Sequence, residues 1–254
     1  MTRTGARKIG CFIFAVAGAY FGMAGAKSTA AEPRTLERET REFKVSVDGK
    51  GRGKCTIEIS RREDGSDRMQ IAAALSFNYV VYEYRYSSAG SEVWKDGRLV
   101  RLENTADFNG TKYVVKAKAD QKEVRVTVNG QSSQVEADVW VTSYWRLPDR
   151  LAQIEPAGGS GIVPAGGGRR ARQGGAVPVA LLDSDKGQRL KGEIRRIGDE
   201  TITVAGQKLT CTHFKIGGDV KVDVWYDGDL RLVRQETVES GHRTLMELTR
   251  LAVE

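Results

Sequence analysis

Residues 92–100 read Glu92-Val93-Trp94-Lys95-Asp96-Gly97-Arg98-Leu99-Val100. Two runs of strand-forming residues flank Asp96-Gly97, a pair that favours a two-residue hairpin turn because both positions tolerate positive φ. In such a hairpin Trp94 lies opposite Leu99, so its indole packs on the apolar face of the sheet and its N–H needs a partner. The stretch predicts an antiparallel hairpin with Trp94 at its end.

The same pattern returns in the second half of the chain as Asp223-Val224-Trp225-Tyr226-Asp227-Gly228-Asp229-Leu230. Both stretches read acid-Val-Trp-x-Asp-Gly-x-Leu, so Trp225 is expected opposite Leu230 across a similar turn. The echo predicts two parts of a sheet with similar design. Either the two tryptophans fix hairpin ends in the core, or they line a ligand groove.

Outward from these hairpins the apolar residues alternate with a period of two. Phe43-x-Val45-x-Val47 runs into Asp48-Gly49, and Cys55-x-Ile57-x-Ile59 follows, which predicts another hairpin. Strands are also expected over 69–77 and 79–86. Further turn signals are Asn109-Gly110, Asn129-Gly130, Gly206 and Ser240-Gly241. Turns at such short intervals predict a mainly all-β fold, an antiparallel meander that forms a strongly curved sheet or incomplete barrel.

The alternation is interrupted between Val139 and Asp185. Residues 140–154 are expected to form a short helix or an irregular crossing broken by Pro148. Residues 156–173 are rich in glycine and contain the cluster Arg169-Arg170-x-Arg172, so they are expected to form a long mobile loop. This loop is either a contact for an anionic surface or a solvated tether between parts of the sheet.

The N-terminal sequence indicates export. Three cations precede an uncharged run of 18 residues, 9–26, which ends in Ala24-Gly25-Ala26, the pattern that a signal peptidase cleaves. We therefore expect a signal peptide over 1–26, cleaved near Ala26, and a periplasmic or secreted protein. An uncleaved membrane anchor is the alternative reading. Residues 27–41 are polar and are expected to be a flexible leader, followed by a single β-rich domain over 42–252.

Composition and cysteine content limit the remaining possibilities. The 254 residues are 40% hydrophobic and 29% charged, which excludes collagen, wholesale disorder and a polytopic membrane protein. The net charge of +7 falls to +4 once the three cations of residues 1–26 are removed, which argues against a nucleic-acid partner. Cys55 and Cys211 remain in the exported chain, either as one disulfide or as two separate buried thiols.

No sequence motif of a known chemistry is present. The two histidines, His213 and His242, lack metal-ligand spacing, and there is no nucleophile elbow, phosphate loop or dinucleotide-binding turn. We therefore predict no catalytic residue, no metal and no cofactor. An exported hydrolase stays a third hypothesis, which clustered carboxylates or two histidines in one cleft would favour.

Several short motifs together resemble a known family. They are Phe43-x-Val45-x-Val47-Asp48-Gly49, Glu92-x-Trp94-x-Asp96-Gly97-x-Leu99, Asn109-Gly110, Ser143-Tyr144-Trp145, Leu182-Asp183-x-x-x-Gly187 and Val224-Trp225-Tyr226-Asp227. The set resembles an uncharacterised group of exported bacterial proteins, domain of unknown function 6134, from about Arg41 to Ala252. That family has no assigned activity, so the resemblance implies no catalytic residue.

The leading functional hypothesis is a non-catalytic exported envelope protein that binds an apolar or lipid ligand on the concave face of its sheet. The candidate ligand-binding residues are aromatic: Tyr79, Tyr82, Trp94, Tyr144, Trp145 and Trp225. The alternative is an interaction module that binds polysaccharide, peptidoglycan or a protein partner through its outer surface.

Overall fold

The computed structural model describes residues 32–79, 82–155, 175–239 and 241–254. Pro33–Glu254 belongs to one unit, to which the following description applies. The predicted signal peptide over 1–26, the first part of the predicted leader and the predicted loop over 156–173 lie outside the described residues.

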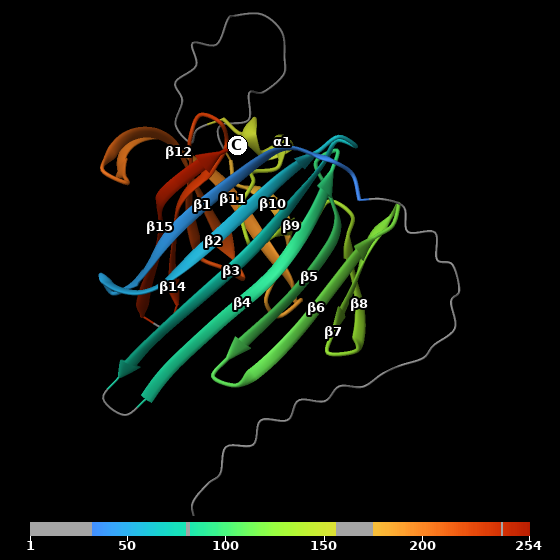
Figure 1. Cartoon of the computed structure of the whole chain (residues 1–254), viewed down its shortest axis with the longest axis horizontal. Helices are drawn as coiled ribbons and strands as arrows, with labels where there is room; N and C mark the ends of the chain where they lie inside the picture. Colours follow the sequence, from blue (N-terminus) through green and yellow to red (C-terminus); the bar gives the residue numbers. More distant parts are fainter. Residues whose placement is uncertain (1–31, 80–81, 156–174, 240) are drawn as a thin grey trace, which may run out of the picture. The chain divides into compact units, whose positions relative to one another are not determined.

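The described elements are almost all strands (Figure 1). In chain order they are β1 (Thr35–Val47), β2 (Lys50–Arg62), β3 (Ser66–Tyr79), β4 (Tyr82–Lys95), β5 (Arg98–Phe108), β6 (Thr111–Ala119), β7 (Glu123–Val128), β8 (Gln131–Glu136), β9 (Trp140–Val141), α1 (Asp149–Ala152), β10 (Val177–Leu182), β11 (Arg189–Val204), β12 (Gln207–Gly218), β13 (Val222–Tyr226), β14 (Leu232–Glu239) and β15 (His242–Val253).

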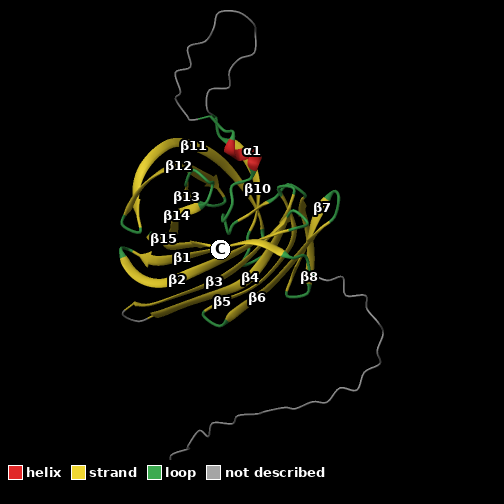
Figure 2. Cartoon of the chain, turned by 45° about the horizontal axis from the view of Figure 1, so that its top comes forward, coloured by secondary structure: helices red, strands yellow, loops and turns green. Residues whose placement is uncertain are grey.

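These strands form one sheet in the order β8-β7-β6-β5-β4-β3-β2-β1-β15-β14-β13-β12-β11-β10-β9. All neighbours are antiparallel except β9 and β10, which are parallel. The sheet is strongly rolled, with β11 and β12 arching at one end and β7 and β8 at the other (Figure 2). Its end strands β8 and β9 do not pair in the described part, so the predicted curved meander and incomplete barrel are confirmed.

Two-residue turns occur where the sequence predicts them. Asp96 and Gly97 have φ of 52° and 73°, and Trp94 pairs with Leu99 across the β4–β5 hairpin. Positive φ also occurs at both residues of Asp48-Gly49, Asn109-Gly110 and Asn129-Gly130. Because the twist of such turns matches that of the flanking strands, they set the register of the meander.

The second tryptophan hairpin differs from the prediction. Trp225 pairs with Arg234, not with Leu230. The carboxylate of Asp227 accepts the backbone N–H groups of Asp229 and Arg231, at 3.0 and 2.9 Å. This side chain organises a wider loop in which Leu230, not Gly228, has a positive φ of 59°. The two matching sequences therefore form different turns.

The predicted flexible leader is wrong from Thr35 onward. β1 begins there and pairs with both β2 and β15, for example through Arg41 with Ile57 and with Leu251. The segment has no apolar period because its buried positions are held by an ion pair between Glu39 and Arg41, whose residues are 9% and 4% exposed. Charge pairing here replaces the alternation that marks the other strands.

Strand limits near residue 78 also differ from the prediction. The ladder between β3 and β4 continues through Asn78 and Glu83 to Tyr79 and Tyr82, so β3 extends two residues beyond the predicted end at Phe77. Phe77 and Tyr84 stack across these strands with ring centroids 5.0 Å apart. Cross-strand aromatic contact of this kind stabilises a hairpin arm.

The described parts of the interruption, residues 139–155 and 175–185, contribute side chains to the inside of the roll. Trp140, Trp145, Leu147 and Leu181 are at most 4% exposed and belong to the same core as the inner face of the sheet. The predicted irregular crossing is therefore a central part of the core. Pro148 does not break a helix but precedes α1, where its φ of −58° suits the first turn.

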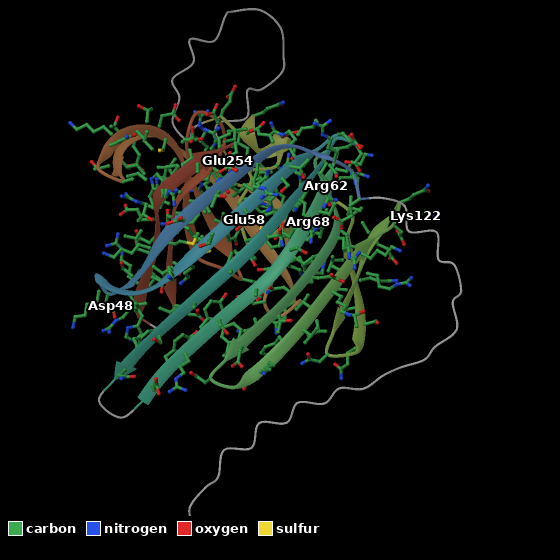
Figure 3. The ribbon with its side chains drawn as sticks, in the orientation of Figure 1. Asp48, Glu58, Arg62, Arg68, Lys122 and Glu254 are labelled. Carbon is green, nitrogen blue, oxygen red and sulfur yellow. The ribbon has the colours of Figure 1, made fainter. Side chains whose placement is uncertain are left out.

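The convex face carries charged side chains. Glu58 of β2 and Arg68 of β3 lie on it, while the neighbouring Ile57 and Met69 are fully buried on the inner face (Figure 3).

The helix found in the described residues is too short to cross a bilayer.

Candidate functional site

The inner face of β4 and β5 carries polar side chains where the alternation leads one to expect apolar ones. Ser88 and Asn104 are 6% and 5% exposed, although Asn104 stands in line with the buried Leu102 and Ala106. Burying a polar group costs free energy unless it is hydrogen-bonded. The two side chains hydrogen-bond each other and face a loop that enters the roll.

That loop joins β10 to β11. Asp183 shapes it, because its Oδ1 accepts the backbone N–H groups of Asp185 and Lys186 at 2.8 and 2.9 Å. Gly187 closes the loop with φ of 66°, and its position leaves no room for a side chain: a Cβ there would lie 2.3 Å from Val128 Cγ2. The motif Leu182-Asp183-x-x-x-Gly187 therefore shapes the loop that positions Asp185 against the inner face of the sheet.

Asp185 is the centre of the site. Its Oδ2 accepts the Tyr86 hydroxyl at 2.7 Å, and its Oδ1 accepts the Ser88 hydroxyl and the Asn104 amide at 2.8 and 2.9 Å. Burial raises the pKa of this carboxyl, and the nearby Asp183 raises it too, while the three hydrogen bonds oppose the shift. The result is a fixed acceptor group on the inner side of the sheet.

Asp185 stands where two cavities meet. The smaller, of about 210 Å³, has a wall of apolar side chains that includes Val45, Ile71, Leu75 and Met246. The larger hollow, of about 620 Å³, is lined by residues of β14, β11 and the 183–188 loop. Both cavities are lined by Thr142, Asp185 and Gln235. An apolar chamber thus adjoins a polar hollow at a buried carboxyl.

Tyr144 is the predicted candidate that reaches the larger hollow. It lines the hollow and is 2% exposed, and its φ is 49°. Its hydroxyl is buried and has no hydrogen-bond partner among the described residues. Burial and the neighbouring Asp183 raise the pKa of this hydroxyl, so it stays protonated at neutral pH. Most buried hydroxyl groups are paired, so the unpaired Tyr144 hydroxyl is an exception among the described residues.

Trp94 and Trp145 are brought together, but they serve the core. Both indole N–H groups donate to Oε2 of Glu92, at 2.6 and 2.9 Å, and the rings meet edge to face with centroids 6.5 Å apart. Arg146 lies 5.7 Å from the centroid of each ring. Neither tryptophan lines the two cavities described above.

Trp225 lies on the other face of the sheet. His213 stacks on it with centroids 4.3 Å apart and an interplanar angle of 13°, and the indole N–H donates to Glu200. His213 is in turn held by Asp223, with Nε2 and Oδ1 2.8 Å apart. This cluster is separate from the Asp185 site, and it fixes β12 to β13.

The two other aromatic candidates pair with each other. Tyr79 ends β3 and Tyr82 begins β4, and the two are cross-strand partners whose side chains lie outside the described part of the structure. The candidate aromatic residues therefore do not form one site.

The two cysteines are separate buried thiols. Cys55 lines the apolar chamber, and burial with the nearby Asp185 raises its pKa to about 12. Cys211 lies in β12 in line with His213, and burial raises its pKa to about 11. Thiols with such pKa values are poor nucleophiles at neutral pH.

Sequence reasoning missed Tyr86, Ser88, Asn104 and Asp185. A usable signal was present for two of them, because strand register places Ser88 and Asn104 on the buried face of β4 and β5. No sequence signal pointed to Asp185, whose position depends on how the 183–187 loop enters the roll. Within the described residues, no group of three His, Cys, Asp or Glu side chains is placed to hold a metal ion.

A solved structure shares this fold. The structure resembles the crystal structure of a beta-barrel-like protein of domain of unknown function DUF1849 from Brucella abortus, with a TM-score of 0.62 and 8% identity, over 87% of this chain and 99% of that one. A DUF1329 family protein from Desulfovibrio piger is also matched, with a TM-score of 0.19 and 12% identity over 85% of each chain. No curated protein matches the chain significantly.

A family model matches most of the described sheet. It covers residues 43–153 and 178–249, which include the β4–β5 hairpin, the crossing segment and the Asp183–Gly187 loop. The chain belongs to the family described as domain of unknown function (DUF6134).

Proposed function

We propose that this chain is a non-catalytic exported envelope protein that holds a small apolar or amphipathic ligand in the cavities on its inner face. The observation that carries the proposal is the junction at Asp185, where an apolar chamber of about 210 Å³ meets a polar hollow of about 620 Å³. Small-molecule sites combine an apolar wall with a few placed polar groups in this way.

The chemistry of the site favours binding over catalysis. Burial raises the pKa of Tyr86 and of Cys55, so both groups stay protonated at neutral pH. The Asp185 carboxyl already accepts three hydrogen bonds from the protein. These groups hold a fixed pattern of donors and acceptors rather than supply an activated nucleophile.

Filling the chamber tests the proposal. Ala73 lines it from β3, whereas the adjacent Ala72 is exposed on the convex face. The probe is N-phenyl-1-naphthylamine, a neutral apolar fluorophore that brightens when it leaves water. We expect Ala73→Trp to weaken probe binding at least tenfold and the matched control Ala72→Trp to leave it unchanged. Ala73→Leu, a milder filling, keeps the test valid if the larger side chain unfolds the protein.

Equal probe binding by both tryptophan variants would overturn the inner-face site. Native mass spectrometry of protein purified from its own envelope gives an independent readout, because a bound amphiphile adds mass to the folded chain.

The proposal of export rests on the sequence of residues 1–26. N-terminal sequencing of the exported protein should show that the mature chain begins near Lys27.

A convex-face groove supports the second candidate, a module that binds an envelope polymer. The groove has a volume of about 850 Å³ and is lined by three cationic residues, Arg52, Lys54 and Arg85, and by two carboxylates, Glu83 and Asp107. Arg85 is paired with Glu83, which reduces the positive charge available to an anionic polymer. Substituting Ser87, which lines this groove, by Trp separates the candidates: it should leave inner-face binding intact and abolish polymer binding.

A further inference from the structure

We infer that the ligand of the inner-face site carries an alkylammonium head, which lies in the larger hollow beside Asp185 while its alkyl chain enters the apolar chamber. This inference rests on the proposed function and specifies the class of ligand. It is carried by the charge of the hollow, by its aromatic wall and by the unpaired hydroxyl of Tyr144.

The hollow is acidic in a protein whose net charge is positive. Its lining includes four carboxylates and two ammonium groups, contributed by Asp183, Asp185, Asp219, Glu239, Lys186 and Lys221. The formal charge of this lining is −4 plus +2, or −2, whereas the whole chain carries +7. A cleft of one sign attracts and retains ligands of the other.

The aromatic wall already holds a cation from the chain itself. The Nζ atom of Lys186 lies 5.1 Å from the ring centroid of Phe108, within the range of a cation–π contact. Phe108 and Tyr144 both line the hollow. An alkylammonium head finds there the kind of aromatic ring that the lysine contacts, beside the carboxylates that line the hollow.

Tyr144 offers a group that the protein leaves unused. Its hydroxyl oxygen is buried without a partner among the described residues, and a tyrosine oxygen can accept a hydrogen bond from an ammonium N–H. Asp183, which helps raise the pKa of Tyr144, has its Oδ1 occupied by backbone N–H groups of its own loop. A head in the hollow lies beside Tyr144 and near the negative charge of the loop, and binding there would give the buried hydroxyl the partner that it lacks.

The size of the apolar chamber suits a short chain. Its wall is formed by Val45, Ile71, Ala73, Leu75 and Met246, from the three strands β1, β3 and β15. An alkyl chain buried there gains the hydrophobic free energy that the head alone lacks. The geometry therefore favours an amphiphile with its charge at one end.

Three ligands with the same alkyl chain test the inference: octylamine, octanol and octanoate, titrated at pH 7 by calorimetry into the full chain. We expect octylamine to bind about tenfold tighter than octanoate, with octanol between them. Asp183→Asn keeps the oxygen that shapes the loop and removes one negative charge, so octylamine affinity should fall about fivefold and octanol affinity should not change. Glu58→Gln removes one charge from the convex face and is the matched control.

Tyr144→Phe separates ligand recognition from structure. If the hydroxyl serves the ligand, the variant should lose octylamine affinity severalfold while its midpoint of urea unfolding stays the same or rises, because a buried unpaired hydroxyl is removed. Equal affinities for the three ligands, or tightest binding of octanoate, would overturn the ammonium head and leave the proposed binding site standing. Absence of binding by all three would overturn both proposals.

Discussion

Trp145 donates its indole N–H to the carboxylate of Glu92 across 2.9 Å, which ties the crossing segment to β4. Trp94 donates to the same Oε2 from two residues along the strand. Glu92 is 1% exposed, so one buried carboxyl pairs two indoles that would otherwise lack acceptors. The side chain of Glu92 therefore joins the β4–β5 hairpin to the crossing segment that contains Trp145.

Glu92→Ala should destabilise the fold by about 2–4 kcal/mol, because it leaves two buried indole donors without a partner. Glu92→Gln, whose amide oxygen can accept both bonds, should cost much less. Urea denaturation at constant pH measures the difference. Glu58→Ala on the convex face is the control, with an expected change within about 0.5 kcal/mol. Equal effects of Glu92→Ala and Glu58→Ala would contradict the role of Glu92.

The same carboxyl predicts a pH dependence with a definite sign. Burial raises the pKa of Glu92 above its usual value of 4.5, and the hydrogen bonds from the two indoles only partly oppose this shift. Below 4.5 the group is protonated in both states, so its contribution to stability is largest and constant there. As pH rises above 4.5 the unfolded state ionises first and stability falls, by at most about 1.4 kcal/mol per pH unit.

Comparing wild type with Glu92→Gln isolates this contribution from other titrating groups. The difference in free energy of unfolding, wild type minus variant, should decrease between about pH 4.5 and the higher pKa of the folded state and then level off. A difference that grows in favour of wild type as pH rises would show that the folded carboxyl is not raised.

Arg41 should be essential for the start of β1. It forms a buried ion pair with Glu39 and donates to the backbone oxygen of Trp145 at 2.9 Å. Arg41→Ala leaves the buried Glu39 with Arg231 as its remaining ion-pair partner among the described residues, so we expect a loss of about 3–5 kcal/mol in urea denaturation. The exposed Arg38 lies on the same strand, and Arg38→Ala should change stability by less than about 0.5 kcal/mol. If both substitutions changed stability by similarly small amounts, the segment that contains Arg38 and Arg41 would be a flexible leader, as the sequence predicts.

The sheet could be predicted from the sequence because its signals are local. Asp96-Gly97 and Asn109-Gly110 set turns through backbone conformation, and the alternation around Phe43 and Cys55 sets the buried face. Thr35 to Glu42 escaped prediction because Glu39 and Arg41 pair with each other inside the fold. That compensation depends on contacts with β2, β15 and Trp145, which no short window of sequence contains.

Gly187→Ala should displace the loop that carries Asp185. A Cβ at this position would lie 2.3 Å from Val128 Cγ2, in addition to the strain of a φ of 66°. Gly110 has a φ of 89° and no atom within 4 Å of a Cβ, so Gly110→Ala isolates the conformational cost alone. We expect Gly187→Ala to cost about 1–3 kcal/mol more than Gly110→Ala in thermal or urea unfolding. Equal costs would show that the loop does not pack against β7 as described.

The two buried cysteines should stay reduced and unreactive in the folded protein. Burial raises the pKa values of Cys55 and Cys211 to about 12 and 11, so little thiolate forms at pH 8. In a Cys11→Ser variant, a disulfide reagent should label no thiol until urea unfolds the chain, and then label two. Loss of two hydrogen masses in the intact protein, together with a fall in stability on adding reductant, would instead reveal a disulfide.

The candidate site was harder to predict than the sheet. Tyr144 was named as an aromatic candidate and does line the hollow, whereas Trp94 and Trp145 proved to be partners of Glu92. Carboxylates in strands usually face solvent, so no sequence signal indicated that Glu92 is buried. The position of Asp185 depends on a loop that contacts β4 and β5 although it is far from them in the sequence. Only the folded structure shows this contact.

Amide chemical-shift mapping with octanol tests the inner-face site most directly, since octanol is neutral and the outcome does not depend on the charge of the head. The largest shifts should fall on Tyr86, Ser88, Asn104 and the Asp183–Gly187 loop, with Glu58 and Gln70 on the convex face unaffected. Shifts confined to the convex face, or no saturable shifts at all, would contradict a ligand site inside the roll.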